Sequence, residues 1–227
     1  MKPQLLHVGE SRSPIVIIDD FSGTLEQIRT IADELAPFPA IEGNYYPGIR
    51  RVIEEADGRA FSYVRSTCEK VAPFLGGGFG VDRFDLQEAS FSLVTLPPER
   101  LEPVQKAPHF DVPEQNVFAL LHYLRVPAGS GTAFYRHRAT GIERVTRDNV
   151  GVFVSAARKE MPAVATAPCY IHGSDPFYEQ VASVEAVPDR VVIYHASLLH
   201  AGVIPADMSF SSDPREVRLT ANFFLKS

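Results

Sequence analysis

A histidine and an aspartate two positions apart, His109 and Asp111, have the types and spacing to bind one metal ion together. In a β-strand, residues i and i+2 project from the same face, so both side chains could reach the same ion. His200 would complete the set, brought in by the fold from 200 − 111 = 89 positions away. Two imidazoles and one carboxylate on one side of a metal make the facial triad of non-haem Fe(II) sites, whose remaining positions are open. The sequence therefore predicts a metal centre at these three residues, open to a co-substrate and O₂.

Two other histidines, His122 and His195, compete for the role of ligand. Successive side chains of a strand point to opposite faces, so His122 should point away from its neighbour Tyr123 and lie on the other face of the sheet. His195 follows directly after a predicted strand at 190–194, and we interpret it as a hydrogen-bonded structural residue. We expect neither of them to bind the metal.

The last predicted strand alternates a polar face of Arg218, Thr220 and Asn222 with an apolar face. An arginine that points into a core needs an anionic partner, because an unpaired buried guanidinium is very costly. A dicarboxylate co-substrate would supply that partner, since the guanidinium binds carboxylates in a bidentate manner. An ion pair with a nearby Asp or Glu is the alternative explanation for Arg218.

The elements that must position these residues differ between the two parts of the chain. Helical spacing of apolar residues prevails in residues 1–80, and capping, proline and glycine signals set the predicted boundaries there. The predicted elements are a strand at 15–18, a helix over 25–35 capped by Thr24 and Gln27, an ordered loop at 45–50, a second helix over 61–71 that ends before Pro73, and a turn at the glycines of 76–80.

From residue 81 on, short apolar runs broken by proline and glycine predict strands. We expect strands at 91–96, 117–126, 132–137, 181–187, 190–194 and 217–225, with a helix over 152–159. Helices followed by many short strands predict a mainly β protein with flanking helices, an α+β arrangement built on a cupin-like jelly roll. We expect one domain over 1–227, in which residues 1–80 pack on a jelly-roll core of 81–227 that holds the metal site.

Composition and missing motifs argue against several classes of binding partner and function. A net charge of −6 and a pI near 5.6 argue against nucleic-acid binding, which needs a basic surface. Cys68 and Cys169 have no CxxC spacing and are expected to be free thiols of a reducing compartment. No signal-peptide core or long apolar stretch is present, so we expect a cytoplasmic protein with no membrane partner. GxSxG, Walker A and HExxH motifs are missing, which leaves acyl-transfer, nucleotide and zincin functions without support.

Taken in order, these residues resemble a known family. The order His109-x-Asp111, Leu121–Leu124, Gly131–Phe134, Arg190–His200 and Arg218 resembles the prolyl 4-hydroxylase-like branch of the Fe(II)/2-oxoglutarate-dependent oxygenases. The start of the chain, 14–21, also looks like the entry of that branch. Residues 135–138 and 218–222 are similar to an uncharacterised bacterial subgroup of the superfamily.

The resemblance implies a double-stranded β-helix and a hydroxylase activity that depends on Fe(II) and on 2-oxoglutarate as co-substrate. It implies that His109, Asp111 and His200 hold the iron, which the 2-oxoglutarate chelates. The distal carboxylate of the co-substrate would lie on Arg218, and the hydroxyl of Tyr123 would contact the same carboxylate. The substrate stays open between a protein or peptide side chain, a free amino acid and another small molecule.

The spacing departs from the family pattern at one place. Arg218 lies 218 − 200 = 18 positions after His200, farther than is usual in relatives, and residues 208–214 read as an inserted loop. Arg215 is therefore an alternative anchor, although it follows Asp213-Pro214 in a predicted turn. Three rival functions also stay open: a cupin-like metal-binding module without turnover, a metalloenzyme that does not use 2-oxoglutarate, and a metal-free interaction protein.

Overall fold

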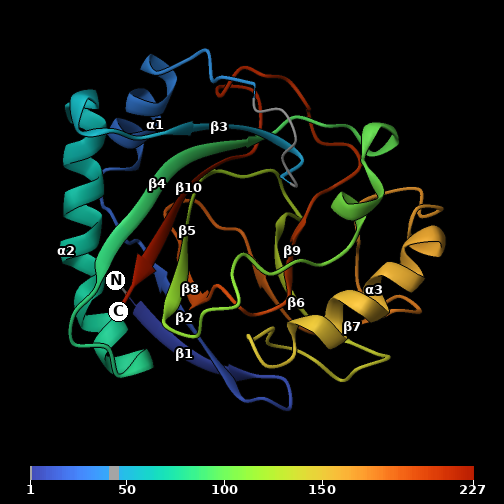
Figure 1. The fold of residues 1–227 in the computed structure, drawn as a ribbon. Helices are drawn as coiled ribbons and strands as arrows, with labels where there is room; N and C mark the ends of the chain where they lie inside the picture. Colours follow the sequence, from blue (N-terminus) through green and yellow to red (C-terminus); the bar gives the residue numbers. More distant parts are fainter. Residues whose placement is uncertain (1, 41–45) are drawn as a thin grey trace.

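The computed structural model describes residues 2–40 and 46–227, and within these ranges the strands form two antiparallel sheets that face each other (Figure 1). The larger sheet has the strand order β1-β2-β8-β5-β10-β4-β3, and the smaller one the order β7-β6-β9. The strands are β1 (Lys2–Val8), β2 (Ser13–Asp19), β3 (Gly48–Val52), β4 (Asp85–Val94), β5 (Val117–Arg125), β6 (Gly131–His137), β7 (Tyr178–Glu185), β8 (Val191–His195), β9 (His200–Val203) and β10 (Leu219–Lys226).

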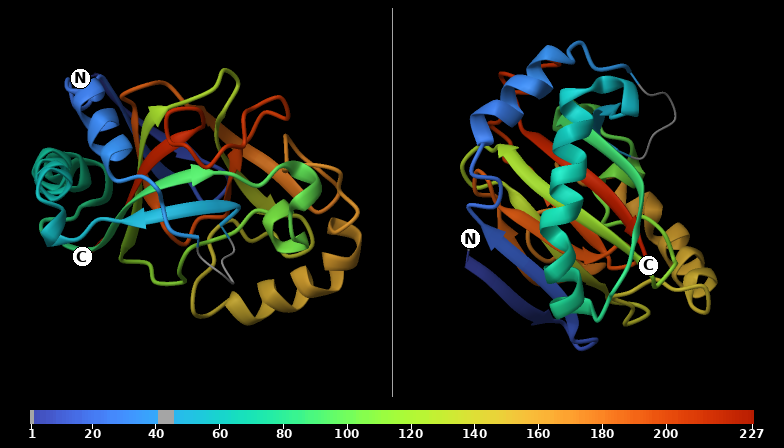
Figure 2. Two further views of the ribbon diagram at one scale, coloured as in Figure 1. Left: turned by 90° about the horizontal axis from the view of Figure 1, so that it is seen from above. Right: turned by 90° about the vertical axis from the view of Figure 1, so that its left-hand side faces the viewer.

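Helices cover the outer faces of both sheets. The α-helices are α1 (Leu25–Glu34), α2 (Arg59–Phe79) and α3 (Val150–Val164), and short 3₁₀ helices lie at Glu55–Asp57, Pro98–Arg100 and Pro103–Lys106. Helices α1 and α2 pack on the outer face of the larger sheet, and the right-hand view of Figure 2 shows α2 running across that sheet. Helix α3 packs through Phe153 and Val164 on the outer face of the smaller sheet, against Tyr135 and Tyr178. The mainly β architecture with flanking helices is the one predicted.

The face of the larger sheet that looks inward changes character across its width. On β2, β8 and β5 it is apolar and packs against the smaller sheet through Phe134 and Val184. On β10, β4 and β3 it is polar, because Arg50 pairs across to Ser92, Ser92 to Thr220, and Ser90 to Asn222. We call these five residues, Arg50, Ser90, Ser92, Thr220 and Asn222, the polar floor. Their rows are in register, so the five side chains share one face.

Helix α2 is longer than predicted. Pro73 lies inside it, and the expected end before Pro73 is wrong. The predicted glycine turn is wrong as well, because Gly76, Gly77 and Gly78 are helical and Gly80, with φ of 69°, forms the left-handed cap. A Cβ on Gly78 would lie 2.5 Å from Cγ2 of Val16, so the missing side chain lets α2 approach β2 closely.

Smaller departures concern the other elements of the N-terminal part. Thr24 is the N-cap of α1, but its side chain makes no capping hydrogen bond, so the predicted capping box is wrong. The predicted loop at 45–50 is in part strand β3, which pairs with β4, while Tyr45 lies outside the described residues. Strand β1 was not predicted; it pairs with β2 as an exposed edge. Within the described ranges, every helix is too short or too polar to cross a bilayer.

The contact between α2 and the sheet is expected to carry much of the stability. Leu75 is fully buried in the cluster that α2 forms with β4 and β10. We expect Leu75→Ala to lower the free energy of unfolding by about 2–5 kcal/mol, because the substitution leaves a cavity in this cluster. Val152→Ala, at an exposed site on α3, is the control and should change it by less than about 0.5 kcal/mol. Chemical denaturation measures both, and equal effects would contradict the packing described for α2.

Candidate metal centre

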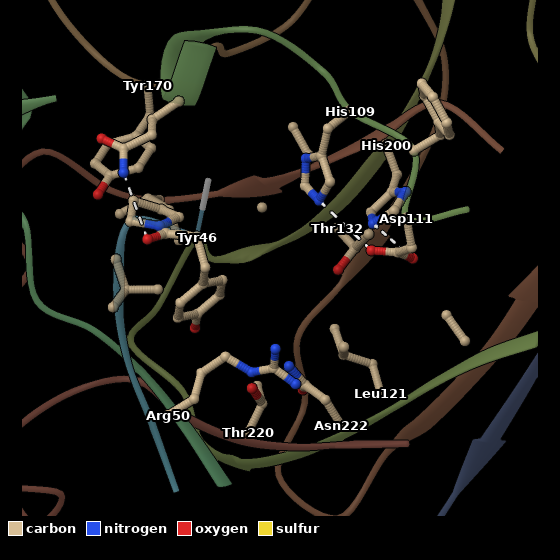
Figure 3. Close-up of a pocket in the computed structure, with 18 of the residues that line it drawn as sticks. Tyr46, Arg50, His109, Asp111, Leu121, Thr132, Tyr170, His200, Thr220 and Asn222 are labelled. Atoms are coloured by element: carbon tan, nitrogen blue, oxygen red, sulfur yellow. Dashed lines mark hydrogen bonds and ion pairs between the residues drawn. The ribbon is translucent and has the colours of Figure 1, made fainter. Parts of the chain in front are cut away.

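The structure brings His109, Asp111 and His200 together between the two sheets. Each residue offers one ligand atom, and these atoms lie within 4.8 Å of one another. Nε2 of His109 is 3.9 Å from Oδ1 of Asp111, and Nε2 of His200 is 3.8 Å from Oδ2 of the same carboxylate (Figure 3). Distances of this size leave room for an ion between the three groups, because a bound metal would lie about 2 Å from each ligand atom.

Backbone hydrogen bonds set this arrangement. The N–H of His109 donates to the carbonyl of His200 over 2.9 Å, and the N–H of His200 donates back over 2.8 Å. The N–H of Asp111 donates to the carbonyl of Ala196 over 2.8 Å. His109 and Asp111 do not share a strand, because His109 forms an isolated bridge to β9 and Asp111 lies in a bend. The loop still presents both side chains to His200, since each end of the triplet is tied to the segment 196–200.

A second hydrogen bond fixes the protonation of His200. Its Nδ1 lies 2.8 Å from the carbonyl oxygen of Leu198, which can only accept, so Nδ1 carries the proton. Nε2 of the neutral ring then has a free lone pair on the side of Asp111. This carbonyl–imidazole contact is the usual means by which a ligating histidine is oriented.

The electrostatics of the triad fit a divalent cation. Burial raises the pKa of Asp111 to about 6, and a buried Oδ2 of this carboxylate has no hydrogen-bond partner. Burial lowers the pKa of His200 to about 4, and burial together with the neighbouring His200 lowers the pKa of His109 to about 4. Both imidazoles are therefore neutral at pH 7, as metal ligands must be. A bound cation would also stabilise the ionised form of Asp111 that burial disfavours.

Arg218 lies in the same cavity, directly before β10. The residue is 4% exposed, and its Nε has no hydrogen-bond partner. In the described part of the chain, no carboxylate forms an ion pair with it, so the alternative of a local Asp or Glu partner lacks support. Arg215 points elsewhere, because its side chain is 69% exposed and pairs with Asp213. Of the two candidate anchors, only Arg218 lines the cavity.

Tyr123 supports the cavity wall from behind. Its ring lies under the guanidinium of Arg218, with 5.6 Å from Cζ to the ring centroid. Its hydroxyl hydrogen-bonds to Oγ1 of Thr132 over 2.7 Å. Among the described residues, Thr132 and Arg218 line the cavity while Tyr123 does not. Thr132 is thus a residue that sequence reasoning left without a role, although it lies in the quoted Gly131–Phe134 motif.

The cavity has a volume of about 260 Å³. The candidate metal ligands lie on one side of it, and Arg50, Thr220 and Asn222 of the polar floor lie on the other (Figure 3). The remaining lining side chains are mostly apolar or aromatic and include Tyr46, Val94, Val104, Phe110, Leu121, Tyr170, Ile171, Tyr194, Ile204 and Phe224. Sequence reasoning missed Arg50, Tyr46 and Tyr170, which come from segments far from the motifs.

The competing histidines are outside this cavity. His122 lies on the other face of the larger sheet, as predicted, where Nδ1 bonds to the hydroxyl of Tyr63 and Nε2 to Asp189. His195 donates from Nδ1 to the carbonyl of Gln115 over 3.1 Å. Both are held by structural hydrogen bonds, and neither belongs to the described metal-ligand cluster.

Sequence comparison identifies the family. Residues 1–225 match the model of DUF6445, which is described as a family of unknown function. The chain belongs to this family. Among curated proteins, none matches the sequence significantly.

Solved structures with the same architecture extend over nearly the whole DUF6445 chain. A prolyl-4-hydroxylase from Pseudomonas putida is 13% identical with a TM-score of 0.50, covering 93% of this chain and 91% of its own. HygX from Streptomyces hygroscopicus with nickel and 2-oxoglutarate bound is 11% identical with a TM-score of 0.54, covering 94% and 83%. The α-ketoglutarate-dependent epimerase SnoN from nogalamycin biosynthesis is 11% identical with a TM-score of 0.57, covering 95% and 78%. At these identities the likeness shows the fold, a double-stranded β-helix, as predicted.

The geometry of the triad predicts that one divalent ion binds per chain. We expect Asp111→Ala and His200→Ala each to weaken Ni(II) binding by about 100-fold or more, because each removes a ligand and not merely a residue that orients one. Isothermal titration measures this, and circular dichroism checks that the fold is retained. His195→Ala is the control, since it removes an imidazole outside the triad. Unchanged Ni(II) binding in the Asp111 and His200 variants would refute the assignment.

Proposed function

We propose that this chain is an Fe(II)- and 2-oxoglutarate-dependent oxygenase. The observation that carries the proposal is Arg218, a buried guanidinium without a carboxylate partner among the described residues, in the same cavity as a His-Asp-His cluster. A buried cation of this kind implies an anionic ligand. Two structures with this fold are consistent with such a ligand: HygX has nickel and 2-oxoglutarate bound, and SnoN is an α-ketoglutarate-dependent enzyme.

In this proposal each group of the cavity has a distinct task. His109, Asp111 and His200 would hold Fe(II), since they provide two neutral imidazoles and one carboxylate. Arg218 would bind the distal carboxylate of 2-oxoglutarate. Thr132 also lines the cavity, and Tyr123 would hold both Thr132 and Arg218 in position. The role of Tyr123 would thus be to position the anchor, with Thr132 between its hydroxyl and the cavity.

When bound, the iron would supply the redox chemistry that converts 2-oxoglutarate, O₂ and a C–H bond into succinate, CO₂ and an oxidised substrate. The protein's own residues orient the reactants and exclude water. The hydrogen bond from Nδ1 of His200 to Leu198 keeps Nε2 available as a ligand. The apolar wall of Leu121, Tyr194 and Phe224 keeps the surroundings of the centre dry.

The rival functions make different demands on Arg218. A metal-binding module without turnover, or a metalloenzyme that needs no dicarboxylate, has no use for an uncompensated arginine beside the metal ligands. Burial of such a group lowers stability, so its presence favours a function that requires the charge.

An anaerobic titration tests the proposed function directly. Purified protein receives Fe(II) and then 2-oxoglutarate, while the visible spectrum is followed for the weak charge-transfer band of the chelate. We expect a band that needs both additions and that His200→Ala abolishes. A folded, iron-loaded protein that shows no band at saturating 2-oxoglutarate would overturn the proposal in favour of a metal-binding module.

The choice of anchor gives a separate prediction. Arg218→Ala should weaken 2-oxoglutarate binding by about 2–5 kcal/mol, because the variant removes one partner of a buried charge pair. Ni(II) affinity should change little, since Arg218 is not a ligand. Arg215→Ala removes the same charge from an exposed position and is the matched control. Both affinities can be measured by calorimetry, and a larger loss in Arg215→Ala than in Arg218→Ala would show that the wrong arginine was assigned.

A further inference from the structure

The cavity holds a second arginine that 2-oxoglutarate would leave without a ligand. This step rests on the proposed function, in which one carboxylate of 2-oxoglutarate binds at the metal with the keto oxygen and the other lies on Arg218. No third anionic group is left for Arg50, which lines the cavity from β3. Arg50 is close enough to the metal centre to lower the pKa of Asp111, although burial outweighs this effect.

Arg50 is held in place on one side and has a free donor on the other. Its Nη2 donates to the carboxylate of Glu88 and, over 2.9 Å, to Oγ of Ser90. Its Nε is buried and has no hydrogen-bond partner. The ion pair with Glu88 therefore orients the guanidinium and leaves the charged Nε–H for a ligand.

Asn222 presents the complementary group. Its Nδ2 donates to Oγ of Ser92 over 3.1 Å, while its Oδ1 is buried without a hydrogen-bond partner. Ionised 2-oxoglutarate has only acceptors, so it cannot satisfy this oxygen. A further ligand with an N–H or O–H donor is needed.

The two unused groups are neighbours across β4. Ser92 is directly opposite Arg50, and Ser90 is directly opposite Asn222. Each of the two side chains reaches diagonally onto β4, because Arg50 bonds to Ser90 and Asn222 bonds to Ser92. The side chains thus converge over this strand, and Figure 3 shows both below the metal ligands. One small ligand on the polar floor could contact Nε of Arg50 and Oδ1 of Asn222 together.

We infer that the polar floor binds the substrate to be oxidised, and that this substrate is a free α-amino acid. Its carboxylate would accept from Nε of Arg50, and its ammonium group would donate to Oδ1 of Asn222. The two groups of an α-amino acid are attached to one carbon, which suits a donor and an acceptor that converge over β4 from the strands on either side of it. The cavity of about 260 Å³ lies at or below the lower end of ordinary ligand pockets and must hold 2-oxoglutarate as well, which restricts the substrate to a small molecule.

Charge balance favours a zwitterion over a plain carboxylic acid. Glu88 already balances the charge of Arg50, so a simple carboxylate would add an uncompensated negative charge to the polar floor. A zwitterion brings one charge of each sign and leaves the total unchanged. Burying a net charge is costly, and the α-amino acid avoids that cost.

The test uses the full chain loaded with Ni(II), which does not turn over, and saturated with 2-oxoglutarate. The probes are the twenty common L-amino acids, added singly and observed by saturation-transfer NMR. We expect transfer to at least one of them and none to its carboxamide, which lacks the anionic group. Arg50→Gln should weaken the binding of that amino acid by at least about tenfold, because it removes a charged hydrogen bond.

Two variants complete the design. Arg51→Gln is the matched control, since Arg51 is the next residue of β3 and pairs with Asp57 instead of facing the cavity. Asn222→Leu should weaken the binding of the amino acid. It should leave 2-oxoglutarate affinity within about twofold, because 2-oxoglutarate has no donor for Oδ1. Retained binding of Ni(II) and 2-oxoglutarate shows that each variant is folded.

The outcomes separate the two proposals. A protein that binds Ni(II) but not 2-oxoglutarate refutes the proposed function, and the inference about the substrate fails with it. A protein that binds 2-oxoglutarate but none of the amino acids keeps its proposed function and overturns the inference alone. Equal amino-acid affinity in the native chain and Arg50→Gln also overturns it.

Discussion

The pair of backbone hydrogen bonds between His109 and His200 is the constraint on which the candidate metal centre depends. Strand β9 pairs with β6 on one side, and the bridge to His109 occupies its other side. The loop that carries Asp111 is thereby joined to the edge of the smaller sheet as a strand one residue long. Two main-chain hydrogen bonds thus fix the distance between residues that are far apart in sequence. The conformational entropy of ordering these residues is lost when the chain folds, so ligand binding does not have to supply it.

The polar floor shows how the fold accommodates groups that reduce its stability. Arg50 and Asn222 each keep a buried atom without a partner, and such groups cost about 1–3 kcal/mol each. The outer face of the same strands offsets this loss of stability, because Phe91, Leu93 and Phe223 pack there beneath α1 and α2. Alternation along β4 and β10 thus lets one segment supply both a core and a site. Natural proteins commonly keep residues that lower stability at the surfaces where they function.

The sequence was informative wherever periodicity carried the signal. Alternation placed Arg218, Thr220 and Asn222 on one face, and it separated His122 from Tyr123. The sequence could not reveal Arg50, because Arg50 and Arg51 are adjacent and only the pairing of β3 with β4 decides which one faces inward. Pro73 and the glycines of α2 led to a predicted helix that is too short. The length of α2 is set by its packing on β2, which is also a long-range contact, and not by local propensity. The bridge at His109 depends on a partner 91 residues on (200 − 109 = 91), beyond any local pattern.

Charge balance connects the metal, the co-substrate and the substrate in one argument. Arg50 and Arg218 line the cavity, and their charges balance those of an ionised Asp111 and of Glu88, which pairs with Arg50, while both histidines are neutral. With the proposed ligands, a divalent ion would add two positive charges, and a dianionic 2-oxoglutarate would remove them again. A zwitterion would then enter without changing the total. Binding of 2-oxoglutarate before the metal would instead leave two excess negative charges in a buried space, which is unfavourable in a low-dielectric interior. The arrangement of charges therefore favours the order metal, 2-oxoglutarate, substrate.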